Sequence, residues 1–373
     1  MAGDVIIVGG GVVGCAIACE LLKRGAQVTL LEREQVGSGA SGAAAGMLAA
    51  QAEGAGDDAF YRLCIASRDR WPAWAAELRE LTGIDVELVQ RGILQPATTP
   101  ERAALLQARA AWQRRAGQRA LWLDAAAARA ALPGLAGPLL GALHLPDDAQ
   151  VQPPRLVQAL AAAIVRRGGS LQAGTPVGGL LHRGGRVVGV QTPGGDRHAG
   201  VVILAAGAWS GGLAAAAGLT VPVAPVKGQI IAVQAPGAAA DPTLCAEAIY
   251  AVPKRDGRLV LGATEEPEAG YDARPTLGGA ARLAGAALAT LPDLAGLPLV
   301  AHWAGLRPAA PDHWPLLGAM AGVPGLLLAT GHFRNGVLLA PVTGAAIAAL
   351  ADGQASPVPL APFAPDRFVA SPA

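Results

Sequence analysis

The sequence predicts an α/β protein, α+β overall, in which a Rossmann-type nucleotide-binding domain is interrupted by a domain built on an antiparallel sheet. Two observations lead to this prediction. Residues 4–31 have the order strand, glycine-rich turn, helix and second strand, which is the order of a βαβ unit. Between residues 225 and 264, three strand-like segments follow one another with no helix between them, which favours an antiparallel sheet.

The βαβ unit begins with a short apolar run over Asp4–Val8, typical of a buried parallel strand. The turn carries the three glycines of the G-x-G-x-x-G pattern: Gly9, Gly11 and Gly14. The first permits a tight turn, the second lets a pyrophosphate approach the backbone, and the third lets helix and strand pack closely. The second strand, Gln27–Leu31, ends at Glu32, where a carboxylate can accept a hydrogen bond from a ribose hydroxyl. These residues predict a dinucleotide site and leave NAD and FAD both open.

Two further segments favour FAD. Gly37–Leu48 consists almost entirely of small residues, whose backbone can lie against a large planar cofactor without side-chain clashes. Val201–Ser210 is an apolar strand ending in Ala-Gly, similar to the later strand that returns to the cofactor in two-domain flavoproteins. The sequence holds no second strand–GxGxxG–helix unit for a nicotinamide cofactor. A flavoenzyme of this kind would pass its electrons to oxygen or a quinone.

The remaining elements follow from composition and periodicity. We expect helices over residues 57–82 (broken near Pro72), 101–119, 124–131 (with Asp124 as cap), 154–167 and 277–291. We expect a strand pair over 86–96, further strands at 187–191 and 201–204, and a loosely structured Pro-rich tail from Ser356. The predicted nucleotide-binding domain comprises residues 1–85, 146–220 and 302–363, and the predicted substrate domain comprises residues 86–145 and 221–301.

Charge and composition exclude several classes of function. The formal net charge of +1 gives no electrostatic footprint for nucleic acid or an anionic membrane. Every apolar segment is shorter than the roughly 20 residues of a membrane span, and the first residues do not resemble a signal peptide. The four cysteines have no ligand-like spacing, so we expect free thiols and no metal site. A soluble cytoplasmic protein is the expectation.

Several longer motifs are more specific than the glycine fingerprint: "GASGAAAGML", "VKGQ", "IYAVPK", "GRLVLGAT", "WAGLRP" and "GHFRNGVLLAPVTG". Together they resemble the FAD-dependent D-amino-acid oxidase superfamily, and within it the glycine oxidases of thiamine biosynthesis. The resemblance runs along nearly the whole chain. It implies a glutathione-reductase-like FAD domain with an inserted antiparallel-sheet domain that roofs a non-covalently bound flavin.

The resemblance also implies roles for individual residues. Arg307 would clamp the substrate carboxylate, Tyr250 would aim its hydroxyl at the same group, and Arg334 would face the substrate. Cofactor contacts are implied for Gly9, Gly11, Val12, Val13, Gly14, Glu32, Arg33, Ala40, Ser41, Ala45, Gly46, Met47, Val177, Ala206, Gly207, His332, Phe333, Arg334, Asn335, Gly336, Val337 and Leu338. Each of the three substrate residues also has a purely structural alternative, such as an ion pair or strand packing.

The implied reaction is transfer of a hydride from the amine-bearing carbon of glycine, sarcosine or a small D-amino acid to flavin N5. Hydrolysis of the imine would give a 2-oxo acid and ammonia, and O2 would be reduced to H2O2. No general base is evident in the sequence. Glu265 and Ala248 depart from the glycine oxidase pattern, and Glu265 either contacts a cationic or bulkier substrate or turns to solvent. The alternatives are a dehydrogenase with another electron acceptor and a non-catalytic flavoprotein subunit, and the resemblance suggests a homotetramer.

Overall fold

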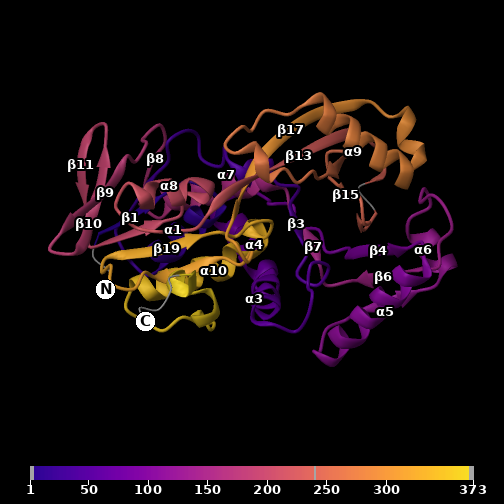
Figure 1. Ribbon diagram of the computed structural model, residues 1–373, viewed down its shortest axis with the longest axis horizontal. Coiled ribbons are helices and arrows are strands. Elements are labelled where there is room, and N and C mark those ends of the chain that lie inside the picture. Colours follow the sequence, from indigo (N-terminus) through magenta and orange to yellow (C-terminus); the bar gives the residue numbers. More distant parts are fainter. Residues whose placement is uncertain (1–3, 239–240, 369–373) are drawn as a thin grey trace.

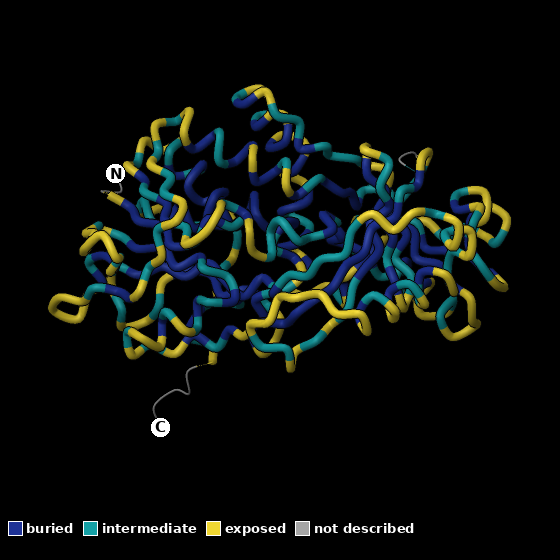
Figure 2. Tube along the Cα trace, turned by 90° about the horizontal axis from the view of Figure 1, so that it is seen from above, coloured by how far each residue is buried: buried dark blue, intermediate teal, exposed yellow. Residues whose placement is uncertain are grey.

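The computed structural model describes residues 4–238 and 241–368, which fold around two sheets (Figure 1). The six-stranded sheet has the strand order β18-β19-β12-β1-β2-β8, and the eight-stranded sheet has the order β17-β13-β16-β15-β14-β4-β6-β5. Buried segments lie in the interior of both halves of the molecule, and exposed segments surround them (Figure 2). This is the mixed architecture that the sequence predicts, a parallel nucleotide-binding sheet with a largely antiparallel second sheet.

The six-stranded sheet is parallel at its centre. β1 (Val5–Val8) lies between β12 (Val201–Leu204) and β2 (Val28–Leu31), and both neighbours run parallel to it. The other strands of this sheet are β8 (Ser170–Gln172), β19 (Leu326–Thr330) and the antiparallel β18 (Leu316–Ala319). Because every residue of β1 is buried, its unbroken apolar run is the pattern expected of a strand covered on both faces.

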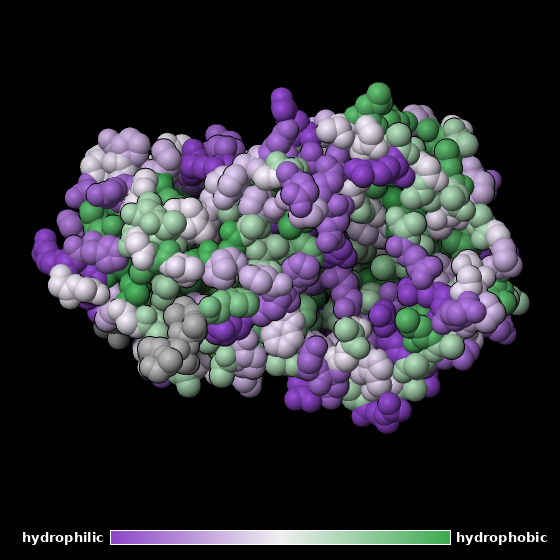
Figure 3. All heavy atoms as spheres, in the orientation of Figure 1, coloured by the Kyte–Doolittle hydropathy of each residue, from purple (hydrophilic) through white to green (hydrophobic). Residues whose placement is uncertain are grey.

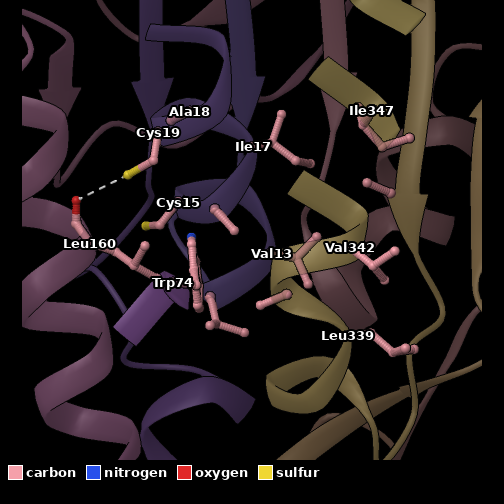
Figure 4. Packing of buried hydrophobic residues seen from close by; sticks show 14 of the residues in the cluster. Val13, Cys15, Ile17, Ala18, Cys19, Trp74, Leu160, Leu339, Val342 and Ile347 are labelled. Atoms are coloured by element: carbon pink, nitrogen blue, oxygen red, sulfur yellow. Dashed lines mark hydrogen bonds between the residues drawn. The ribbon is translucent and has the colours of Figure 1, made fainter. Parts of the chain in front are cut away.

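Two apolar helices cover this sheet. α1 (Val12–Lys23) packs between α10 (Gly336–Ala351) and α7 (Pro153–Arg166) (Figure 4). α10 is apolar on all sides and is buried over nearly its whole length, so it is a core helix and not an amphipathic surface helix. Cys15 and Cys19 are free and buried in this packing, and the Cys19 thiol donates to the carbonyl oxygen of Leu160. The prediction of free thiols is confirmed for these two residues.

The eight-stranded sheet carries the second half of the cavity described below. Its core is an antiparallel run of β17 (Leu299–Ala309), β13 (Ala224–Gln234), β16 (Arg258–Gly262) and β15 (Tyr250–Pro253). β14 (Thr243–Cys245), β4 (Ile93–Ala97), β6 (Gly141–Leu145) and β5 (Leu121–Leu123) complete it, with a parallel pair at β14 and β4. The predicted domain boundary at 301/302 falls within β17, which pairs with β13 along its length, and we propose that β17 belongs to this sheet's domain.

The predicted helices form with small shifts at their ends. The expected break near Pro72 separates α3 (Ala59–Arg68) from α4 (Trp71–Thr82), and Asp124 caps α6 (Ala125–Ala131) by accepting from the backbone N–H of Ala127. The other long helices are α5 (Pro100–Arg115), α7 and α9 (Leu277–Thr290), and the shorter ones are α2 (Ala40–Ala43) and α8 (Ser210–Ala215). The small strands are β3 (Met47–Leu48), β7 (Ala149–Gln150), β9 (Gly179–Arg183), β10 (Arg186–Thr192) and β11 (Gly195–His198).

Two expectations from the sequence are wrong. Residues 86–96 do not form a strand pair, because Glu87 and Gly92 adopt positive φ and interrupt the extended chain, and Val89 makes an isolated bridge to Gln150. Residues 357–368, predicted as a loosely structured tail, are ordered. Phe363 is buried in the main core, and the Arg367 side chain donates to the carboxylate of Asp312. A buried aromatic anchor and a hydrogen-bonded arginine hold this Pro-rich segment against the domain.

The surface adds two observations. In the part of the chain that the structure describes, no helix is long and apolar enough to cross a membrane. Hydrophobic residues gather at the upper edge of the face in Figure 3, in the region of α9 and β17, where Leu277 and Leu299 are exposed. The homotetramer suggested by the sequence remains a prediction.

Candidate active site

A cavity of about 1270 Å³ extends from the glycine fingerprint to the predicted carboxylate clamp. It is bounded by the carboxyl ends of β1, β2 and β12, by residues 37–55, by the β13, β15, β16 and β17 strands and by residues 329–337. Among the predicted site residues, only Gly14 and Leu338 are absent from its lining. The structure therefore brings together residues that are more than 300 positions apart in the sequence.

The glycine fingerprint has the backbone geometry that the sequence predicts. Gly9 has a φ of 110°, and a side chain there would collide with the backbone of Ala205. A side chain at Gly14 would collide with the Gly9 carbonyl, so Gly14 serves the close packing of helix on turn. At Gly11 an added Cβ meets only the Ser41 hydroxyl, which accepts from the backbone N–H of Val12 at 2.9 Å. The N-terminus of α1 therefore faces the cavity with a polar, sterically open surface.

Glu32 and Arg33 stand at the end of β2. One carboxylate oxygen of Glu32 accepts from the Gly10 N–H at 2.7 Å and the other accepts from the Glu34 N–H at 2.9 Å. These bonds fix the carboxylate at the edge of the cavity, where it keeps lone pairs for a ribose. The Arg33 guanidinium lies 3.7 Å from the ring centroid of Trp209, a cation–π contact that encloses this end of the cavity.

The small-residue loop, Gly37–Leu48, is held against the eight-stranded sheet by two side chains that donate to its backbone. Trp303 Nε1 donates to the Ala43 carbonyl at 2.9 Å. Lys254 Nζ is buried and donates to the carbonyl of Ala45 at 2.6 Å. The same ammonium donates to Gln150 Oε1 and the Val151 carbonyl, and burial lowers the pKa of Lys254 to about 7.

The C-terminal loop reaches the cavity immediately before α10. Phe333 has a φ of 47°, and the positive φ turns the chain so that residues 332–337 line the cavity. His332 is buried, its Nε2 contacts the Thr343 hydroxyl at 3.1 Å, and burial lowers its pKa to about 3. Burial therefore keeps His332 neutral. Leu338 does not line the cavity, and its carbonyl accepts from Trp71 Nε1 and the Ser67 hydroxyl.

Arg307 lies flat on β13 at the other end of the cavity. Its Nη1 donates to the Thr264 carbonyl at 3.1 Å and to the Lys227 carbonyl at 3.5 Å. The guanidinium lies over Gly228, where any side chain would overlap it. Tyr250 lies over Gly262 in the same way, since the two residues are paired in register between β15 and β16. Glycine at 228 and 262 therefore makes the space that the clamp side chains occupy.

Arg334 and Glu265 form an ion pair with each other at the wall of the cavity. Both side chains are partly exposed, at 48% and 41%. The pair joins the C-terminal loop to the segment after β16. The sequence left two alternatives for Glu265, contact with a cationic or bulkier substrate or exposure to solvent, and neither included Arg334 as a partner. The ion pair also neutralises much of the charge of Arg334.

Glu53 is a site residue that the sequence analysis missed. Its carboxylate opens into the cavity, accepts from Asn335 Nδ2 at 3.2 Å, and has no ion pair within the described residues. The surrounding protein raises its pKa, against the opposing effect of Arg334 and Arg307. The loop before Glu53 is fixed because Asp148, itself buried, accepts from the backbone N–H groups of Gln51 and Ala52. The sequence signal for Glu53 is an acidic residue five positions after the strand-like segment "GML". No neighbouring residue in the sequence indicates that this acid lies in the same cavity as Arg307.

The residues present fit FAD. The open face at Gly11, the fixed carboxylate of Glu32 and the small-residue loop occur along one continuous cavity, in the order that a dinucleotide followed by a flat ring requires. Within residues 4–238 and 241–368, no group of His, Cys, Asp or Glu side chains is arranged to hold a metal ion.

Comparison with known proteins agrees with this geometry. The family model described as "FAD dependent oxidoreductase" matches residues 4–350. Glycine oxidase of Geobacillus kaustophilus is 41% identical over 368 residues, which are 98% of this chain and 97% of that protein. Its crystal structure superposes with a TM-score of 0.94 and covers 99% of this chain and 100% of that one. The bifunctional protein ThiO/ThiG of Trichormus variabilis is 39% identical over 99% of this chain, which matches 55% of that longer protein.

The family model covers most of the chain, and the relatives match it almost from end to end. The predicted two-sheet fold, the FAD cofactor and the enzyme class are therefore confirmed. The chain belongs to the FAD-dependent oxidoreductase family, as an enzyme similar to glycine oxidases.

Proposed function

We propose that the protein oxidises a small amino acid, with glycine, sarcosine and small D-amino acids as candidates, to the 2-oxo acid and H2O2, with release of ammonia from a primary amine or of methylamine from sarcosine. One observation carries this proposal. Arg334 and Glu265 neutralise each other, whereas Arg307 and Glu53 have no ion-pair partner within the described residues. The clamp end of the cavity thus offers one cation and one anion without an ion-pair partner, which is the charge pattern complementary to an amino-acid zwitterion.

In this arrangement Arg307 binds the substrate carboxylate through its guanidinium fork. Tyr250 adds a hydrogen bond, because burial raises the pKa of its hydroxyl and keeps it protonated as a donor. Glu53 accepts from the substrate ammonium and takes up its proton, which leaves the uncharged amine that the oxidation requires. The raised pKa of Glu53 makes this proton transfer less unfavourable.

Bound FAD supplies the electron acceptor, and the side chains above supply orientation. Two fixed contacts, one at the carboxylate and one at the amine, define the position of the carbon between them. Similarity to glycine oxidases supports O2 as the final acceptor, and similarity to the bifunctional ThiO/ThiG proteins supports a role in thiamine biosynthesis. Since Cys245 is the last cysteine in the sequence, the flavin loop holds no thiol for covalent attachment. We propose non-covalent binding and a homotetramer.

The test is an anaerobic titration of the FAD-loaded protein with glycine, sarcosine, D-alanine and D-proline, followed by flavin absorbance and then by peroxide formation on admission of air. We expect bleaching and prompt H2O2 with at least one of them. Arg307→Lys, which keeps the charge and loses the fork, should raise KM by roughly 10- to 100-fold. Bleaching without peroxide would identify the dehydrogenase alternative. No bleaching with any substrate would refute the proposal.

A further inference from the structure

The cavity continues past the zwitterion site toward α5. This extension, called here the α5 arm, is lined by Gln95 of β4, by Arg102 and Arg109 of α5, and by residues 245–248 of the turn between β14 and β15. It adjoins the clamp directly, because Cys245 pairs in register with Tyr250, and Ala52, which contacts Arg109, precedes Glu53. A substrate held at Arg307 can therefore extend into the α5 arm.

Arg109 is a guanidinium without an acidic partner. Both of its hydrogen bonds come from Nη1, to the Ala52 carbonyl at 2.9 Å and to Gln95 Oε1 at 3.1 Å. No ion pair of Arg109 occurs within the described residues. Burial lowers its pKa, and the neighbouring Arg102 lowers it further. Its Nε and Nη2 groups and its charge are left without an anion.

Arg102 stands seven residues earlier on the same face of α5. Its side chain is 17% exposed, and its buried Nε has no hydrogen-bond partner within the described residues. Arg102 forms an ion pair with Glu247, but the Glu247 side chain is 66% exposed, and its Oε1 lies 3.7 Å from Arg102 Nε, too far for a hydrogen bond. Asp58, which also lines the cavity, already caps α3 by accepting from the Tyr61 N–H.

Two like charges in one cavity wall repel each other, and each has lost part of its hydration. Such an arrangement is costly unless an anion binds between the two groups. A purely structural role would use the donors of both side chains, but the structure uses only Nη1 of Arg109 and leaves Nε of Arg102 unsatisfied. The geometry therefore favours an anionic ligand at this place.

We propose that Arg109 and Arg102 form a second anion subsite, which binds the distal carboxylate of a substrate whose α-carboxylate is held by Arg307. The preferred substrate class is then a glycine that carries an N-linked carboxyalkyl group, with glycine and sarcosine as smaller substrates of the same site. This inference rests on the proposed function and specifies its substrate class.

The test compares two matched series, N-(carboxyalkyl)glycines with one to three methylenes and the corresponding primary amides, which have the same shape without the charge. For the chain length that spans the two subsites, kcat/KM of the carboxylate should exceed that of the amide by at least ~10-fold, the value of one charge-assisted hydrogen bond. Arg109→Gln and Arg102→Gln should each reduce this ratio severalfold, and Arg109→Lys should retain part of it. Arg115→Gln removes the same charge from an exposed position of α5 and serves as the matched control.

A calorimetric titration with dicarboxylates that lack an amine provides a readout independent of turnover. The Kd of the best-fitting dicarboxylate should rise in Arg109→Gln and stay unchanged in Arg115→Gln. A wild-type carboxylate-to-amide ratio near one overturns the subsite, as does an equal loss for both series, which would mean that Arg109 acts only by positioning Ala52. If wild type oxidises neither a glycine derivative nor a small D-amino acid, the proposed function fails, and the calorimetry still decides whether the α5 arm binds anions.

Discussion

Replacing Gly228 by alanine should disable the carboxylate clamp without touching the clamp residue itself. A Cβ at this position overlaps three atoms of the Arg307 guanidinium, where ordinary van der Waals contact begins at 3.4 Å. The guanidinium must retreat by about 1 Å, and it then loses its alignment with the Thr264 carbonyl. Loss of the aligned charge-assisted hydrogen bonds to the carboxylate costs about 1.5–3 kcal/mol, so kcat/KM for glycine should fall by roughly 10- to 100-fold.

The assay is steady-state peroxide formation with the flavin spectrum recorded on the same sample. Most of the loss should come from KM, because Arg307 binds the carboxylate in the ground state as well as in the transition state. Gly278→Ala is the matched control, since an added Cβ on α9 meets nothing within 4 Å, and this variant should keep full activity. A Gly228→Ala enzyme whose kcat/KM stays within ~3-fold of wild type would show that the carboxylate does not bind at Arg307.

Three further changes test the surrounding structure. Glu53→Gln should raise KM for glycine by ~10- to 100-fold and move the rise of kcat/KM toward higher pH, because the amine must then arrive uncharged; an unchanged pH profile would exclude Glu53 as the proton acceptor. Lys254→Met should lower the free energy of unfolding by about 1–3 kcal/mol, measured in urea, and speed the release of FAD, because the Ala45 and Val151 carbonyls lose their donor; an unaltered midpoint would contradict this. Burial raises the pKa of Asp148 to about 7 from 3.8, so its stabilising contribution is present below pH 3.8 and is lost as the pH rises through 7. The free energy of unfolding of wild type should therefore fall, relative to that of Asp148→Asn, as the pH rises from 4 to 7. A difference that does not depend on pH would refute this assignment.

The cofactor half of the cavity was predictable because its requirements are local. A parallel strand, three glycines at fixed spacing and an acid after the next strand lie within residues 4–32, and each has one physical reason to be there. The helices and most strands follow from equally local periodicity and capping. The wrong predictions concern positions where distant contacts decide the outcome. Val89 pairs with Gln150 instead of a neighbouring strand, and Phe363 orders a tail whose composition predicts a loose chain.

The substrate half of the cavity depends on the register of the strands in the eight-stranded sheet. Contacts between segments far apart in the sequence determine that register. Arg307 reaches the Thr264 carbonyl only because β13 lies between β17 and β16 with Gly228 beneath the guanidinium. Glu53 lines the same cavity but belongs to a different loop. Asp148, which is distant from this loop in the sequence, fixes the loop's backbone. The family resemblance implies that Arg307 binds the carboxylate, but no motif marks Glu53 as a partner for the amine, because no spacing relates residue 53 to residue 307.

The pairing of charges decides which of these residues can act on a substrate. The clamp end of the cavity holds Arg307, Arg334, Glu53 and Glu265, and any of these four charged side chains could bind one end of a zwitterion if it had no partner. The ion pair between Arg334 and Glu265 removes one charge of each sign and leaves Arg307 and Glu53. The same reasoning, applied to the α5 arm, leaves Arg109 without an ion-pair partner among the described residues and Arg102 with only the exposed carboxylate of Glu247. Glu265→Gln should release Arg334 as a second unpaired cation beside Arg307, and the enzyme should then accept dicarboxylic substrates that bypass the α5 arm altogether.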